Sequence, residues 1–225
     1  MTTLTNRIAA IQVKMLHLQF RMKKIYEDQK RLTDKLPKYK TPQEIIKGMN
    51  NAVYNTIDMI VTFEHMFQLS NDIFSTPELK EKFTEEITRI IGTVRSVAHR
   101  WKPVRNKLGG HIDLQAIEGF CRENKYVGVF LSEDIECDLG MLNMLLLESA
   151  VNSVNDQTKL FEEKIDIKRN DPGPEMKRFV ETLNRDWNKV FSYFEPLMRF
   201  MYTVGKEEKM RCTPPDEWKG LIYTL

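Results

Sequence analysis

Three residues near the middle of the chain, Arg105, Asn106 and His111, carry side chains that can act together on a phosphodiester. A His titrates near neutral pH and can take or give a proton under physiological conditions. An Arg holds a permanent positive charge on a planar fork that matches phosphate oxygens. An Asn donates and accepts hydrogen bonds, so it can orient a hydroxyl group or the His ring. We interpret these three as candidate catalytic residues.

The chemistry expected from this set is cleavage of RNA by its own 2′-hydroxyl group. His111 would serve as acid or base, and Arg105 would stabilise the charge that develops on the phosphate. Gly109 and Gly110 lie between them and allow a bulky substrate to approach the backbone. This route requires neither a metal ion nor a cofactor, and DNA should resist it because DNA lacks the attacking hydroxyl.

The pattern Arg105-Asn106-x4-His111 resembles the Arg-x(4–6)-His motif of the HEPN superfamily of helical bundles, in which a polar residue, often Asn, follows the Arg. The resemblance covers these seven residues and the fold class. It implies a metal-independent endoribonuclease of the kind found in toxin–antitoxin, phage-defence and RNA-processing systems. It also implies RNA as substrate, a homodimer that brings two motifs into one cleft, and a protein inhibitor as a candidate partner. An acidic residue on an earlier helix sometimes assists in this family, and both Asp58 and Glu64 are candidates.

A second interpretation of the same residues involves no catalysis. Arg105 can be an ordinary solvated charge in a basic turn, and His111 can cap a helix that begins after the two glycines. The chain would then be a non-enzymatic helical interaction or scaffold protein that dimerises or binds a partner through its N-terminal helix.

The N-terminal 36 residues have the clearest periodicity in the sequence. Apolar residues alternate spacings of three and four, which defines an a/d heptad seam with one polar position at Gln29. The seam residues are Ile8, Ile11, Met15, Leu18, Met22, Ile25, Leu32 and Leu36. Basic residues dominate the other faces of this helix. The seam can dock on the chain's own bundle or join two chains, and the sequence leaves both arrangements open.

Proline residues divide the rest of the chain into helices. Thr41-Pro42-Gln43-Glu44 predicts a helix start with a capping box, running to about Ser70. Thr76-Pro77 predicts the start of a third helix, and Pro103 predicts a break or kink near Lys102. Further helices are expected over about 111–124 and 135–167, with an extended connection at 126–131 between them. A last helix begins near Pro174, Pro196 should kink it, and a short tail follows from 212.

Composition narrows the class of protein. The charge of +2 and the hydrophobic fraction of 41% are typical of a globular domain. Three widely spaced Cys form neither a disulfide framework nor a zinc pattern, so a reducing compartment is expected. The N-terminal apolar run is interrupted by Arg7 and Lys14, which is unlike a signal peptide, and no run is long enough to span a membrane. We expect a cytoplasmic protein with no membrane contact.

These observations together predict an all-α bundle of five or six main helices, HEPN-like, that forms a single domain over 1–225. Its parts are a basic heptad helix at 1–36, a core bundle with the motif at 41–168, and a C-terminal helix and tail at 174–225.

Overall fold

The computed structural model describes residues 3–35, 38, 40–110, 118, 135–154, 160–161, 165–167 and 173–207. Within these ranges the chain forms helices and no strand, which confirms the expected all-α bundle. The six main helices are α1 (Thr3–Lys35), α2 (Pro42–Phe74), α4 (Glu85–Arg105), α6 (Ile135–Asn152), α7 (Pro174–Ser192) and α8 (Phe194–Glu207). No helix in the described ranges combines the length and the apolar composition needed to cross a bilayer.

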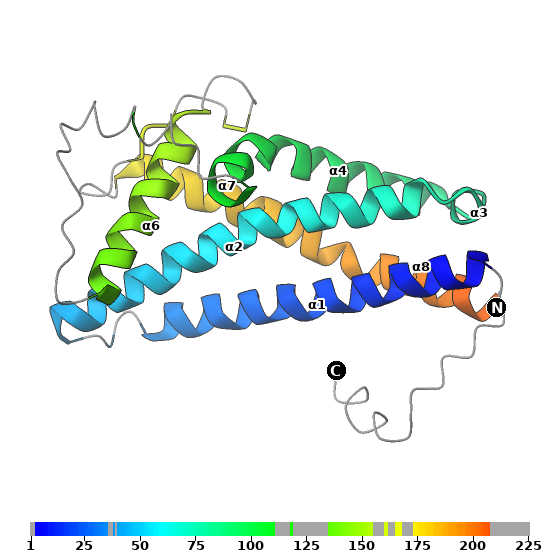
Figure 1. Ribbon diagram of the computed structural model, residues 1–225, viewed down its shortest axis with the longest axis horizontal. Coiled ribbons are helices and arrows are strands. Elements are labelled where there is room, and N and C mark those ends of the chain that lie inside the picture. The colour runs from blue at the N-terminus through cyan, green and yellow to red at the C-terminus, as the bar shows by residue number, and fades with distance from the viewer. Residues whose placement is uncertain are drawn as a thin grey trace.

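The second helix lies at the centre of the bundle. It packs against α1 on one side, α4 on another and α6 across its N-terminal half, as Figure 1 shows. The last helix, α8, lies beside α1, and α7 continues behind the bundle to contact α4. Figure 1 shows α1 and α4 on opposite sides of α2, and α8 contacts both of them.

The heptad seam of α1 is buried within its own chain. Its residues from Ile8 to Ile25 are no more than 4% exposed, and Leu32 is 8% exposed. They pack on α2 and α8, so the arrangement in which the seam docks on its own bundle is the one observed. The polar seam position also has a partner, because buried Asn55 donates through Nδ2 to Gln29 Oε1 at 2.9 Å. Leu36 lies outside the described residues.

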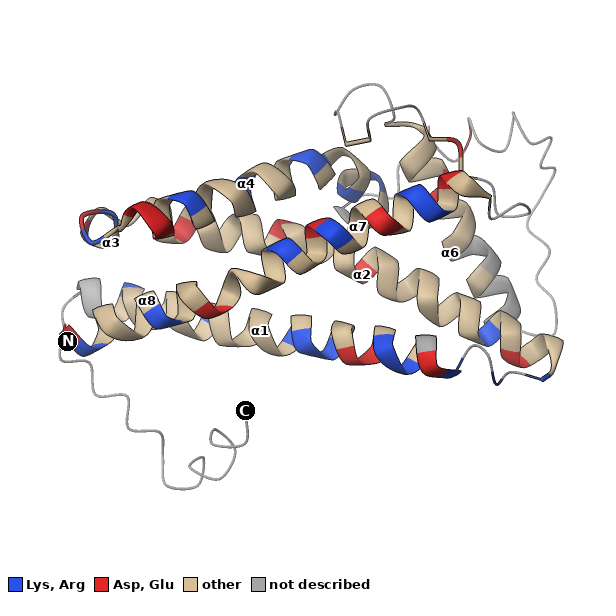
Figure 2. Ribbon diagram, turned by 180° about the vertical axis from the view of Figure 1, so that it is seen from behind, with Lys and Arg blue, Asp and Glu red and all other residues tan. Residues whose placement is uncertain are grey.

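Three cations along one edge of α1 bind α2 and the residues that follow its C-terminal end. Arg7 Nε donates to Thr76 Oγ1, Lys14 pairs with Asp72 at 2.6 Å, and Arg21 pairs with Asp58. These cations follow one another at intervals of seven residues, which keeps them on the same edge of the helix. The charged segments of α1 and α2 are visible along both ribbons in Figure 2.

The start of α2 agrees with the sequence prediction in detail. Thr41 Oγ1 accepts from the backbone N–H of Glu44 at 3.2 Å, and Glu44 Oε2 accepts from the N–H of Thr41 at 3.1 Å, which completes the capping box. Hydrogen bonds from the backbone N–H groups of Lys40 and Thr41 lower the pKa of the Glu44 carboxyl.

The third predicted helix begins later than its proline suggests. Thr76 and Pro77 open only one turn, α3 (Pro77–Lys80), and the Thr76 side chain makes no capping bond there. Its hydroxyl instead donates to the carbonyl of Asp72 and accepts from Arg7. The long helix starts after Thr84, whose hydroxyl caps the N–H of Ile87 at 3.2 Å.

Of the break or kink predicted near Lys102, the break was wrong, because α4 continues through Pro103 to Arg105, and the kink stays a prediction. Proline removes one helical hydrogen bond. Burial near the proline compensates, since Trp101, two residues before it, and Val104, directly after it, are both fully buried. The irregularity comes after the helix instead, as a π-helical turn at Asn106–Gly110.

The helix predicted over 135–167 ends much earlier, at Asn152. The Asn152 side chain binds the returning chain: its Oδ1 accepts from the N–H of Ile167, and its Nδ2 donates to the Ile167 carbonyl, both at 2.9 Å. Leu160, Phe161 and Ile165 are buried without being helical. The apolar pattern past 152 therefore reflects burial of an irregular segment, which periodicity cannot distinguish from a helix.

The C-terminal helix divides at Tyr193, three residues before the proline that was expected to kink it. Pro196 then lies in the first turn of α8, where a missing N–H leaves no helical bond unmade. The predicted helix at 111–124, apart from helical Glu118, the connection at 126–131 and the tail lie outside the described residues.

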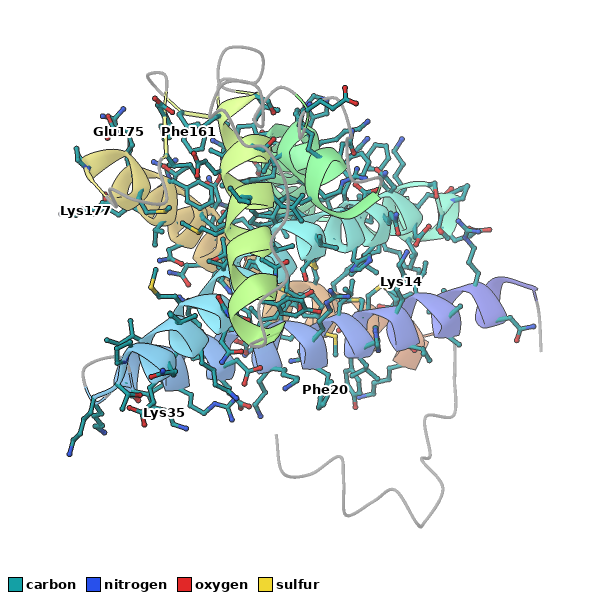
Figure 3. All side chains as sticks on the ribbon, turned by 60° about the vertical axis from the view of Figure 1, so that its left-hand side comes forward. Lys14, Phe20, Lys35, Phe161, Glu175 and Lys177 are labelled. Atoms are coloured by element: carbon teal, nitrogen blue, oxygen red, sulfur yellow. The ribbon has the colours of Figure 1, made fainter. Side chains whose placement is uncertain are left out.

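The centre of the core is aromatic. Trp101 is stacked on Phe63 at 5.7 Å between ring centroids and meets the edges of Phe161 and Phe179. Figure 3 labels Phe161 close to α6 and α7. The Trp101 Nε1 donates to Asp186, whose two oxygens also accept from Arg100, so this buried carboxylate ties α4 to α7.

Candidate functional site

The candidate catalytic segment begins where α4 ends. Arg105 is the last residue of α4, and Asn106 is the C-cap and opens the π-helical turn. Val104 and Leu108 are buried and hold this turn against the core. A π-helical turn inserts an extra residue into the helical spacing, and such turns occur frequently at functional sites.

Arg105 is bound to the central helix. Its Nη2 donates to Glu64 Oε2 at 2.6 Å, and the side chains are only 19% and 23% exposed. The Arg105 Nε is buried and has no hydrogen-bond partner among the described residues. Arg105 is therefore not the ordinary solvated charge of the second interpretation. It is a guanidinium oriented by a carboxylate at the edge of the core.

The pairing distinguishes the two acidic candidates. Glu64 contacts Arg105, whereas Asp58 pairs with Arg21 of α1 on another side of α2. The sequence could not choose between them because the choice depends on how α2 and α4 are aligned. No local signal joins two residues that are 41 positions apart.

The other two predicted residues differ in what the structure describes. Asn106 is exposed, so its amide is accessible to a ligand beside Arg105. His111 lies one residue beyond the π-helical turn and outside the described residues. The predicted convergence of Arg105 and His111 on one phosphate therefore stays a prediction.

A second titratable group lies beside Glu64. Burial lowers the pKa of His65 most, and the positive charge of Arg21 lowers it further; Glu64 raises it, Lys14 lowers it by less, and Asp58 raises it least. A His in such surroundings stays neutral at pH 7. The central helix thus directs Glu64 toward the end of α4 and carries His65 near the cations of α1.

The remaining histidines and acids suggest no further centre. His17 and His99 are exposed. Among the residues that the structure describes, no group of three or more His, Cys, Asp and Glu could hold a metal ion.

What the described site offers is one oriented guanidinium with an exposed amide next to it. Such a pair can bind a phosphate group and hold it in a fixed position. A comparison of the chain with protein-family models, with curated proteins and with solved structures found no match.

Proposed function

We propose that the protein is a metal-independent endoribonuclease of HEPN type that cleaves RNA through its 2′-hydroxyl group. The observation that carries the proposal is the ion pair between Glu64 and Arg105. It fixes the guanidinium at a helix end, six residues before the one His that follows the motif's Gly-Gly pair. An Arg held in this way is prepared for phosphate, because its orientation is set before the substrate binds.

Each residue has a distinct role in this proposal. The 2′-oxygen attacks phosphorus, the bond from phosphorus to the 5′-oxygen breaks, and the products carry a 2′,3′-cyclic phosphate and a 5′-hydroxyl. His111 removes the proton of the 2′-hydroxyl or supplies the proton to the leaving 5′-oxygen, and water carries the other transfer. Arg105 stabilises the negative charge on the phosphoryl oxygens, and Asn106 orients the attacking hydroxyl. Glu64 acts as a positioning residue through Arg105.

The experiment measures cleavage of a labelled RNA by the purified chain in the presence of a chelator. We expect products with cyclic-phosphate ends, no cleavage of an oligonucleotide with 2′-deoxy sugars, and a loss of about 100-fold or more for His111→Ala. His99→Ala is the matched control, since His99 is an exposed histidine on α4 outside the motif. Circular dichroism checks that each variant is folded. Cleavage that survives His111→Ala, or that is absent from the folded wild-type chain, rejects the proposal.

One observation favours a second candidate, a non-enzymatic helical interaction protein. The N-terminal helix exposes Val13, Leu16 and Phe20 although its heptad seam is already buried. Exposed apolar groups gathered on one side of a helix are typical of a surface that binds another protein. The two candidates differ in the cleavage assay, because only the ribonuclease requires His111.

A further inference from the structure

The outward side of α1 is apolar where a solvated surface is expected. Val13 is 66% exposed, Leu16 52% and Phe20 69%, and they follow one another at spacings of three and four. Figure 3 shows the Phe20 side chain pointing away from the neighbouring helices. We call these three residues with Ala9 the outer face of α1. None of them takes part in the buried seam, so the fold of one chain does not require them to be apolar.

The outer face continues onto α8. Gln12 Nε2 donates to the carbonyl of Met201 at 3.0 Å, which places α8 beside the edge of α1 that carries Leu16. Phe200 and Thr203 line a groove on the opposite flank of α8, toward α4. Tyr202 therefore lies on the flank next to α1, and it is 68% exposed. Two adjacent helices thus contribute to one apolar surface.

The size of this surface agrees with half of a protein interface. A fully exposed aromatic side chain presents about 150–250 Å², so the exposed fractions of Phe20, Tyr202, Val13 and Leu16 sum to roughly 500 Å². A partner in a standard interface contributes about 800 Å², with an apolar centre and a polar rim. The outer face is large enough to be the centre of such an interface.

The charged residues along α1 favour one relative orientation of two α1 helices that pack against each other. The N-terminal half of the outward side holds Ala9, Ala10 and Val13, whereas Lys23 and Lys24 are exposed in the C-terminal half. Two α1 helices side by side in parallel would bring those lysines together, and like charges repel. In an antiparallel pair centred near Leu16, each lysine pair lies opposite the alanines of the other copy. The same register places Val13 against Phe20 of the second copy, with Tyr202 nearby.

We propose that two copies of the chain associate as an antiparallel, two-fold symmetric pair through the outer face of α1. The surface is self-complementary about Leu16, as a two-fold interface must be. Since α1 and α4 border opposite sides of α2, as Figure 1 shows, the two Arg105 residues lie on the far sides of the pair. This pair therefore differs from the homodimer with two motifs in one cleft that the HEPN resemblance implies. The inference depends on the outer face alone and not on RNA cleavage.

Sedimentation equilibrium of the full chain over a range of concentrations tests the pairing. We expect the wild type to have twice the chain mass, and Leu16→Glu to weaken association about 100-fold or more, because symmetry buries two added charges at once. Tyr54→Glu is the matched control: Tyr54 is 65% exposed on α2, away from the outer face, and the variant should associate as the wild type does. Leu16 is half exposed, so the urea midpoint of Leu16→Glu should stay close to that of the wild type.

Cross-linking tests the register. Leu16→Cys should form a disulfide between copies under mild oxidation, whereas Glu27→Cys should not, because position 27 lies far from the two-fold axis. The wild type, oxidised in the same way, is the control for the three cysteines that the chain already contains. A wild-type chain that remains monomeric at all concentrations overturns the proposal. So does a dimer that Leu16→Glu leaves intact, or a link through position 27 in place of 16. If the ribonuclease proposal also holds, Leu16→Glu and the wild type should cleave RNA equally well per chain. A wild-type chain that pairs but does not cleave RNA rejects the ribonuclease proposal and leaves the pairing proposal intact.

Discussion

Glu64 of α2 and Arg105 of α4 form a 2.6 Å ion pair between two side chains that are each less than a quarter exposed. The pair joins the central helix of the bundle to the segment that carries the candidate site. A charge held at the edge of the core depends on its counter-charge, since removing one partner leaves the other poorly solvated. This relationship makes Glu64 a residue on which both stability and the proposed activity depend.

Replacing Glu64 by Gln should therefore lower the free energy of unfolding by about 1–2 kcal/mol, because a hydrogen bond between charged groups becomes one with a neutral acceptor. Urea unfolding followed by circular dichroism measures the change. Glu195→Gln is the matched control, since Glu195 and Arg199 form a pair that is 71% and 79% exposed. There the change should stay within about 0.5 kcal/mol. Equal losses in the two variants would show that burial does not strengthen the Glu64 pair.

The same two residues indicate how far the sequence could lead. The heptad seam of α1 and the capping box at Thr41 were predicted correctly because each depends on neighbours within one or two turns. The choice of Glu64 over Asp58 could not be predicted, because it depends on how α2 lies against α4 and α1.

Boundaries set by tertiary contacts were also missed. The cap at Thr84 replaced the one expected at Thr76, whose hydroxyl binds elsewhere, and α6 ends at Asn152 because that side chain binds the backbone of Ile167. For the candidate site, the sequence predicted Arg105, Asn106 and His111 by residue type, and their catalytic roles stay predictions. The orientation of the guanidinium became evident only from the structure.

Gly140 should tolerate no larger residue. A Cβ built there would lie 1.3 Å from Asn50 Oδ1, so the side-chain amide of Asn50 on α2 occupies the space beside Gly140 of α6 and has to move for a larger residue. We expect Gly140→Ala to lower the free energy of unfolding by about 1–3 kcal/mol, as overpacking does in a close contact. In the matched control, Gly92→Ala on α4, a Cβ meets nothing within 4 Å. Ala is the better helix former, so this control should gain about 0.5–1 kcal/mol.

The opposite sign of these two Gly→Ala changes is the informative result. Thermal unfolding of both variants measures it, and the midpoints should move in opposite directions. If Gly140→Ala raises the midpoint as Gly92→Ala does, the Asn50 side chain or α6 moves aside at no cost and the close contact is not needed for the fold.

Asp186 should be the most sensitive acidic residue in the described part of the chain. Its side chain is 2% exposed and accepts from Trp101 and from Arg100. Asp186→Ala leaves a buried indole N–H without an acceptor and Arg100 without its counter-charge, so we expect a loss of about 3–5 kcal/mol in urea unfolding. Glu181→Ala on the same helix removes an exposed carboxylate and should change stability by less than about 0.5 kcal/mol. A loss below about 1 kcal/mol for Asp186→Ala would contradict a structural role for this carboxylate.

His65 should make the stability of the fold depend on pH. Burial, together with Arg21 and Lys14, lowers its pKa below the ordinary value of 6.5, and Glu64 and Asp58 oppose this only in part. The unfolded chain then binds a proton more readily than the folded chain. The contribution of His65 to stability is fully present above pH 6.5. It decreases as the pH falls from 6.5 toward the lowered pKa, by at most about 1.4 kcal/mol per pH unit.

Unfolding in urea at several pH values between 5 and 8 measures this slope. Carboxylates also titrate toward the acid end, so the difference between wild type and His65→Gln isolates the histidine. Parallel curves for the wild type and His65→Gln would mean that His65 takes up its proton equally well in both states, and that the cations of α1 do not act on it.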